Sequence, residues 1–225
     1  MMHQLNEDQK AIFDRVMSAA RRVRMETDYK DHEYVDADTM HRSAVPYRMS
    51  DNEVHDDLSE NGYPFYFVDG PGGTGKTFLY NCLINNLLAE QLEVLPVAYT
   101  GIAATLLLNG RTSHSVFKIP IPTLCDSICD VKKNSKQADY LRSVRVIIWD
   151  EAPMVSRTIL DCVDHLFRDI CGMPRVPFAG KVVVLGGDFR QVLPVIRRAD
   201  KKINFLVRPS NNLPYGSIFI PIILL

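Results

Sequence analysis

Residues 65–80 constrain the fold of this chain more than any other segment. The apolar run at residues 65–68 predicts a buried strand, and the apolar periodicity from Lys76 onward predicts a helix. The loop between them fits the pattern G-x-x-x-x-G-K-[ST] and contains Gly70, Gly72, Gly73, Thr74, Gly75, Lys76 and Thr77. A strand, such a loop and a helix in succession predict a nucleoside triphosphate site in an α/β sheet.

Each residue type in this loop has a chemical reason. Glycines let the backbone curl so that its N–H groups point at phosphate oxygens. The helix that follows directs its positive N-terminal end at the same anion. We expect Lys76 to reach the β- and γ-phosphates and the Thr77 hydroxyl to coordinate Mg²⁺.

Two later strands end in residues suited to the same site. Residues 144–149 form a β-branched apolar run with Asp150 and Glu151 directly after it. Because ligands gather at the carboxyl ends of parallel strands, we expect Asp150 to hold Mg²⁺ and Glu151 to polarise an attacking water. Residues 181–185 predict another buried strand, and Gln191 just beyond it is placed to sense the γ-phosphate.

The composition excludes several other classes of protein. The chain has 225 residues, of which 46% are hydrophobic and 24% charged, as in a globular protein. No apolar run reaches the roughly 20 residues of a membrane span. The five cysteines include no C-x-x-C pair, and His32, His41 and His55 are irregularly spaced. We therefore expect reduced thiols in an intracellular protein and no structural metal. The sequence does not give the oligomeric state.

Charge and periodicity divide the chain into four parts. Residues 1–24 predict an N-terminal helix. Residues 25–62 carry 11 Asp/Glu against 3 Lys/Arg without a sustained period, which predicts an acidic, flexible insertion. Residues 63–198 hold the strands and motifs described above. Residues 199–225 show no further strand–loop–helix unit and are expected to form a divergent tail.

Gln9 has two interpretations. Asn6 is a plausible N-cap and Gln9 stands at the third helical position, which is the spacing of a capping box. Alternatively, the Gln9 amide reads an adenine edge, because it can donate and accept at once. The residues alone favour the cap.

The polar segment at residues 111–117 also has two interpretations. Thr112, Ser113 and His114 lead to a lone aromatic residue, Phe117. The segment is either a capped turn with Phe117 packed beneath it, or a loop that binds nucleic acid. In the second case hydroxyl and N–H groups contact phosphates and the aromatic ring stacks on a base. The residues do not decide between them.

Strands with ligand-bearing C-terminal ends, helices between them and a phosphate loop at the start predict an α/β fold. We expect a P-loop NTPase with a RecA-like, doubly wound, mostly parallel sheet and helices on both faces. Four motifs then resemble a specific family. They read Gly-Pro-Gly-Gly-Thr-Gly-Lys-Thr, Thr-Gly-Ile-Ala-Ala with Gly-Arg-Thr-Ser-His-Ser-Val-Phe, Asp-Glu-Ala-Pro-Met, and Gly-Gly-Asp-Phe-Arg-Gln-Val-Leu-Pro-Val.

These motifs resemble those of the petite-integration-frequency (Pif-type) DNA helicases of helicase superfamily one. Their sequences are most similar to those of the eukaryotic, helitron-like branch. The resemblance covers most of residues 4–198 outside the acidic segment. It implies a motor domain that hydrolyses ATP with Mg²⁺ and moves 5′ to 3′ on single-stranded DNA. It also implies roles in DNA repair, recombination or telomere maintenance, in the nucleus or alternatively the mitochondrion.

The resemblance implies residue roles as well. Gln9 matches the adenine-reading glutamine. Lys76, Glu151 and Gln191 match catalytic positions, and Thr77 and Asp150 match the Mg²⁺ site. The positions that match motifs lining the DNA groove are Thr100, Gly101, Thr112 and His114.

The chain departs from the family pattern after about residue 198. Family members continue into a second RecA-like domain that supplies arginines to the ATP site, and we expect that domain to be absent from residues 199–225. Since such an arginine is worth roughly 10³–10⁵ in rate, we expect ATP binding, weak single-stranded DNA binding, slow hydrolysis and no strand separation. The alternatives are a truncated, non-catalytic module that binds ATP and DNA, and an ATPase that acts on a partner other than nucleic acid.

Overall fold

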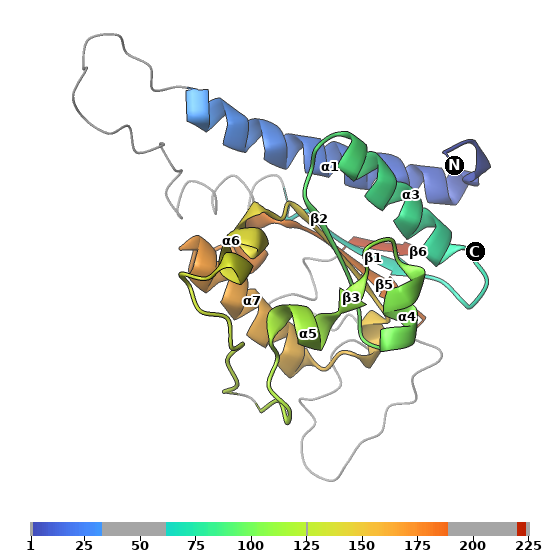
Figure 1. The fold of residues 1–225 in the computed structure, drawn as a ribbon. Coiled ribbons are helices and arrows are strands. Elements are labelled where there is room, and N and C mark those ends of the chain that lie inside the picture. Colours follow the sequence, from blue (N-terminus) through green and yellow to red (C-terminus); the bar gives the residue numbers. More distant parts are fainter. Residues whose placement is uncertain (1, 33–61, 125, 189–219, 224–225) are drawn as a thin grey trace.

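A six-stranded sheet forms the centre of the molecule (Figure 1). The computed structural model describes residues 2–32, 62–124, 126–188 and 220–223. Every neighbouring pair of strands is parallel, and the strand order is β3-β2-β4-β5-β1-β6. The strands are β1 (Phe65–Asp69), β2 (Val94–Ala98), β3 (Arg111–Thr112), β4 (Val146–Asp150), β5 (Val182–Gly187) and β6 (Ile220–Ile223).

Helices cover both faces of this sheet, so the predicted doubly wound α/β class is confirmed (Figure 1). One face carries α1 (Glu7–His32), α3 (Lys76–Ala89) and α4 (Gly101–Leu106). The other face carries α5 (Ser113–Phe117), α6 (Lys136–Ser143) and α7 (Arg157–Cys171). Short 3₁₀ turns lie at η1 (Met2–Gln4), η2 (Ala152–Met154) and η3 (Pro177–Gly180).

The sheet separates two hydrophobic cores, and β4 shows how. Val146 and Ile148 pack with α1 and α3, whereas Ile147 and Trp149 pack with α5 and α7. This follows from the two-residue alternation of side chains along a strand. Burial on both faces explains why these strands are continuous apolar runs in the sequence.

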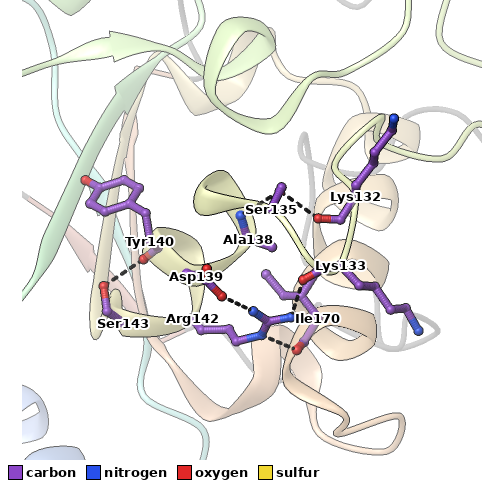
Figure 2. A network of polar contacts seen from close by, with 9 residues as sticks. All are labelled: Lys132, Lys133, Ser135, Ala138, Asp139, Tyr140, Arg142, Ser143 and Ile170. Carbon is purple, nitrogen blue, oxygen red and sulfur yellow. Dashed lines mark hydrogen bonds and ion pairs between the residues drawn. The ribbon is translucent and has the colours of Figure 1, made fainter.

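The helices on the second face are tied together by polar contacts around Arg142 (Figure 2). Its Nε donates to the carbonyl oxygen of Ile170 at 2.8 Å, which joins α6 to α7. Its terminal nitrogens donate to the Asp139 carboxylate at 2.6 Å and to the carbonyl oxygen of Lys133 at 2.5 Å. One side chain therefore holds the segment before α6, α6 itself and the end of α7 in register.

The structure differs from the sequence-based expectation at two boundaries. The first helix continues to His32 instead of ending at residue 24, so the irregular segment starts later than expected. Within the expected tail, residues 220–223 form β6, which pairs with β1 in parallel. The rest of the acidic segment, with His41 and His55, lies outside the described residues.

Candidate nucleotide and nucleic-acid site

The phosphate loop lies between β1 and α3, as the sequence predicted. Gly73 and Gly75 have φ angles of 87° and 79°, a left-handed conformation that glycine adopts without steric cost. A Cβ on Gly75 would lie 2.6 Å from the Nε2 atom of Gln9. The backbone conformation therefore favours glycine at Gly75, and a Cβ there would also force the Gln9 side chain to shift.

Lys76 folds its ammonium group back over this loop. Its Nζ donates to the carbonyl oxygens of Gly70 at 2.5 Å and Pro71 at 2.9 Å. Thr74 Oγ1 donates to the same Pro71 oxygen at 2.9 Å. Thr77 follows in the first turn of α3 and is half-buried. The loop therefore gathers a cation, a hydroxyl and curled backbone in one place, which suits an anionic phosphate.

Gln9 is a capping residue and also a link to the phosphate loop. The Asn6 side chain accepts from Gln9 N at 2.8 Å, and Gln9 Oε1 accepts from Asn6 N at 3.1 Å, which confirms the capping box. Gln9 Nε2 donates to the carbonyl oxygen of Thr74 at 3.0 Å. The adenine-reading role remains a prediction.

Asp150 and Glu151 stand at the carboxyl end of β4. Asp150 Oδ1 accepts from Glu151 N at 2.9 Å. Burial raises the pKa of Asp150 above its usual value, and the positive charge of Lys76 opposes that shift. Asp150 is thus close enough to the phosphate loop for the two charged groups to interact, although β5 lies between their strands.

Glu151 is held in an unusual conformation by a residue of another strand end. Its φ angle is 56°, a left-handed value that is uncommon for a residue with a side chain. Its Oε2 atom accepts from Thr100 N at 2.9 Å and from Thr100 Oγ1 at 2.7 Å. The sequence placed Thr100 in a DNA motif and gave no sign of this contact.

Tyr80 and the glycines at the end of β5 lie close to this site, and no sequence motif identified them. The Tyr80 side chain is fully buried, and its hydroxyl has no hydrogen-bond partner among the described residues. Burial raises the pKa of the Tyr80 phenol well above its usual value, and the charge of Asp150 adds to that shift. The sequence offered two signals: a tyrosine inside an apolar helix, and a Gly186-Gly187 pair at the end of a strand.

The residues assigned to the DNA groove gather at one edge of the sheet. Ala98 of β2 pairs with Thr112 of β3, so Thr100 and Thr112 both lie at or just beyond the carboxyl ends of neighbouring strands. Gly101 begins α4 directly after Thr100. The His114 ring packs edge-on against Tyr99, with centroids 5.7 Å apart. The structure thus brings all four predicted residues into one region.

Phe117 belongs to the core and not to this edge. Its side chain is 0% exposed, and its ring packs against Trp149 and Phe167 at centroid distances of 5.4 and 5.8 Å. The stacking role of Phe117 is therefore wrong, because Phe117 is packed beneath this segment. The contacts of Thr112 and His114 with DNA phosphates stay predictions. A single aromatic residue after polar residues cannot reveal its burial, since that depends on α7.

Three further expectations concern Gln191, metal binding and membrane spans. Gln191 lies outside the described residues, so its role as γ-phosphate sensor stays a prediction. In the part of the chain that the structure describes, no three or more His, Cys, Asp or Glu residues form a group able to hold a metal ion. Among those same residues, no helix combines the length and apolar character of a membrane span.

The parallel sheet, the phosphate loop and the acidic pair at the end of β4 define the class of P-loop NTPases with a RecA-like fold. The family model described as PIF1-like helicase matches residues 49–213. This chain therefore belongs to the PIF1-like helicase family.

Individual relatives agree with this family. The ATP-dependent DNA helicase PIF4 of Trypanosoma brucei brucei is 33% identical over 132 residues, which is 56% of this chain and 16% of that protein. The ATP-dependent DNA helicase PIF1 of Emericella nidulans is 31% identical over 170 residues, 72% of this chain and 22% of that protein. This chain thus spans under a quarter of either relative.

Solved structures give the same result. The crystal structure of Bacteroides Pif1 bound to single-stranded DNA matches with a TM-score of 0.56 and 26% identity, over 78% of this chain and 42% of that one. A structure described as the basis for unwinding of forked double-stranded DNA by two coordinating Pif1 helicases matches with a TM-score of 0.52 and 29% identity. That match covers 68% of this chain and 36% of the other.

Proposed function

We propose that this chain is the ATP-binding motor portion of a DNA helicase that couples ATP hydrolysis to 5′-to-3′ movement on single-stranded DNA. One observation carries the proposal. The phosphate loop with Lys76 and the acidic pair Asp150 and Glu151 lie at the same edge of one parallel sheet, and charge interaction links Asp150 to Lys76. That edge also carries the residues that match DNA-groove motifs.

The protein's own groups have distinct roles in this proposal. Lys76 exchanges its loop carbonyls for the β- and γ-phosphates of ATP, since an anionic oxygen is a stronger acceptor than a neutral one. Gln9 contacts the adenine, and Gln191 senses the γ-phosphate. Glu151 accepts a proton from the attacking water, which is the role of a general base.

Thr77 and Asp150 fit a Mg²⁺ site. Their donors are a hydroxyl and a carboxylate oxygen, and Mg²⁺ prefers one or two protein oxygens together with phosphates and waters. A cation beside Asp150 would also offset the burial that raises the pKa of this carboxyl group. When bound, Mg²⁺ neutralises charge on the phosphates.

Thr100, Gly101, Thr112 and His114 contact the backbone of single-stranded DNA in this proposal. Hydroxyl and backbone N–H groups bind phosphates without reading sequence, so binding is insensitive to base order and falls steeply with salt. Roles in repair, recombination or telomere maintenance, in the nucleus or mitochondrion, rest on family membership alone.

A second candidate is a module that binds ATP and DNA without turnover. The observation that favours it is the Glu151 carboxylate, whose Oε2 atom already accepts two hydrogen bonds from Thr100. A carboxylate engaged in this way is a weaker acceptor for a proton from water.

ATP turnover measured with and without oligo(dT) separates these candidates. Turnover that DNA stimulates, and that Glu151→Gln abolishes, supports the motor. Binding of both ligands without turnover supports the module instead. Turnover that is indifferent to DNA would contradict both candidates and point to an ATPase with another partner.

A further inference from the structure

Thr100 uses both of its hydrogen-bond donors on one atom of Glu151. The Thr100 N–H and the Thr100 hydroxyl both donate to Glu151 Oε2, at 2.9 and 2.7 Å. The single hydroxyl proton is therefore used by the carboxylate, while the hydroxyl oxygen accepts from Ala103 N at 3.3 Å. The contact is long-range in sequence and arises because Ala98 of β2 pairs with Asp150 of β4.

The order of the strands gives this contact a direction. The phosphate loop follows β1, which lies beyond β5 on one side of β4, whereas Thr100 follows β2 on the other side. The contact therefore holds the Glu151 carboxylate toward β2 and away from the strand that carries the phosphate loop. A general base must reach a water on the nucleotide, so this position restrains Glu151.

The donors of Thr100 suit a second acceptor. Threonine hydroxyls and backbone N–H groups are common ligands of nucleic-acid phosphates, and a phosphate oxygen competes with a carboxylate oxygen for the same anion-binding donors. We propose that Thr100 is a positioning residue for Glu151, whose donors pass from the Glu151 carboxylate to a backbone phosphate when single-stranded DNA binds. This inference rests on the proposed function. It explains how DNA contact with Thr100 at the end of β2 frees Glu151, the general base at the end of β4.

Thermodynamic linkage provides a test that requires no turnover. If DNA binding releases Glu151, then weakening the hold of Glu151 on Thr100 must favour DNA binding by the same factor. Glu151→Gln removes the charge from the competing acceptor and keeps its shape. Glu93→Gln is the matched control, because it makes the same change at an exposed glutamate directly before β2, at the opposite end of that strand from Thr100.

The experiment measures the affinity of the nucleotide-free chain for fluorescently labelled oligo(dT) at fixed salt, with melting curves to verify folding. We expect Glu151→Gln to tighten binding about fivefold or more, within the usual range of coupling between sites. Glu93→Gln should change binding by less than about twofold, as expected for an exposed and screened charge. In a Thr100→Val background the gain from Glu151→Gln should shrink, since only the N–H donor remains. Thr100→Ser, which keeps the hydroxyl, should restore it.

Three results would overturn this assignment, and they are distinguishable. If Glu151→Gln tightens binding no more than Glu93→Gln, the effect is general charge and not competition for donors. If the gain is unchanged in the Thr100→Val background, Thr100 does not position Glu151. If the native chain fails to bind oligo(dT) at all, the proposed function itself is wrong and the inference falls with it.

Discussion

The Tyr80 hydroxyl occupies the space that a side chain at position 186 would need. A Cβ built on Gly186 would lie 1.6 Å from the hydroxyl oxygen and 2.6 Å from the ring carbon that bears it. Gly186 pairs with Val68 of β1, so this contact lies directly under the start of the phosphate loop. Tyr80 of α3 and Gly186 of β5 thus together set the distance between this helix and the sheet beneath the phosphate loop.

Gly186→Ala should therefore destabilise the protein, because the buried Tyr80 side chain has no room to retreat. We expect a loss of about 1–3 kcal/mol in the free energy of unfolding, as for other overpacked cores. Denaturant melts measure it, with Gly101→Ala as control since a Cβ there meets nothing within 4 Å. Adding Tyr80→Phe to the Gly186→Ala protein should recover part of the lost stability, because it removes the hydroxyl oxygen nearest to the new Cβ. Equal stability of the two alanine variants would show that the contact is not rigid.

Lys76→Ala should lower nucleotide affinity by an order of magnitude or more, because charge-assisted hydrogen bonds contribute about 1.5–3 kcal/mol each. The fold should persist, since the hydrogen bonds of the ammonium group among the described residues go to carbonyls of the loop. Calorimetry with an ATP analogue gives the affinity. Lys10→Ala, at an exposed lysine of α1, is the matched control and should bind normally. Unchanged affinity in a folded Lys76→Ala protein would refute the assignment of the phosphate site.

Gln9 can be tested separately as a cap and as an adenine reader. Asn6→Ala removes the cap on the Gln9 N–H and leaves the bond from Gln9 to Thr74. Gln9→Ala keeps that cap and removes the two bonds of the Gln9 side chain, to Asn6 N and to the Thr74 carbonyl oxygen. Asn6→Ala should cost about 0.5–2 kcal/mol of stability through the lost cap, and Gln9→Ala about 0.5–1.5 kcal/mol for each lost side-chain hydrogen bond. Only Gln9→Ala should reduce the preference for ATP over GTP, measured by competition binding. The same loss of preference in Asn6→Ala would assign the effect to the helix end.

Asp150→Asn should make the nucleotide-free protein more stable and its Mg²⁺-dependent nucleotide binding weaker. The folded-state pKa of Asp150 is raised, so the folded state binds its proton more readily than the unfolded state does. This carboxyl group therefore lowers stability as pH rises through and above its unfolded pKa, and the neutral amide removes that penalty. Melting temperatures at pH 7 and Mg²⁺ titrations of nucleotide binding measure the two effects, and a less stable variant would contradict the first.

Phe117→Ala should destabilise the chain by about 3–5 kcal/mol, the usual cost of truncating a buried phenylalanine. Phe117→Leu, which fills most of the same space, should fold and bind oligo(dT) like the native chain. Loss of DNA affinity in a stably folded Phe117→Leu protein would revive the stacking interpretation.

The sequence predicted the features whose causes are local. The phosphate loop and the acidic pair after β4 each follow from a pattern within about twenty residues, and the structure contains both. The buried faces of β4 and β5 were equally visible, because both read as β-branched runs.

The features that the sequence missed depend on strand order and packing. The contact between Thr100 and Glu151 exists because β2 lies beside β4, which no local pattern states. The close approach of Tyr80 to Gly186 requires α3 to cross the end of β5. The strand β6 has only four residues, including Pro221, and pairs with β1, the first strand in the sequence.

The two neighbours of β1 have a consequence for how this protein is made. The strand that carries the phosphate loop pairs with β5 and β6, both of which come much later in the chain. During synthesis, residues 65–69 leave the ribosome long before either partner, so both edges of this strand stay unpaired while β2, β3 and β4 emerge. Unpaired edges invite wrong pairing. The nucleotide site is therefore among the last parts to assemble, and ATP binding by a nascent chain would report that the sheet is complete.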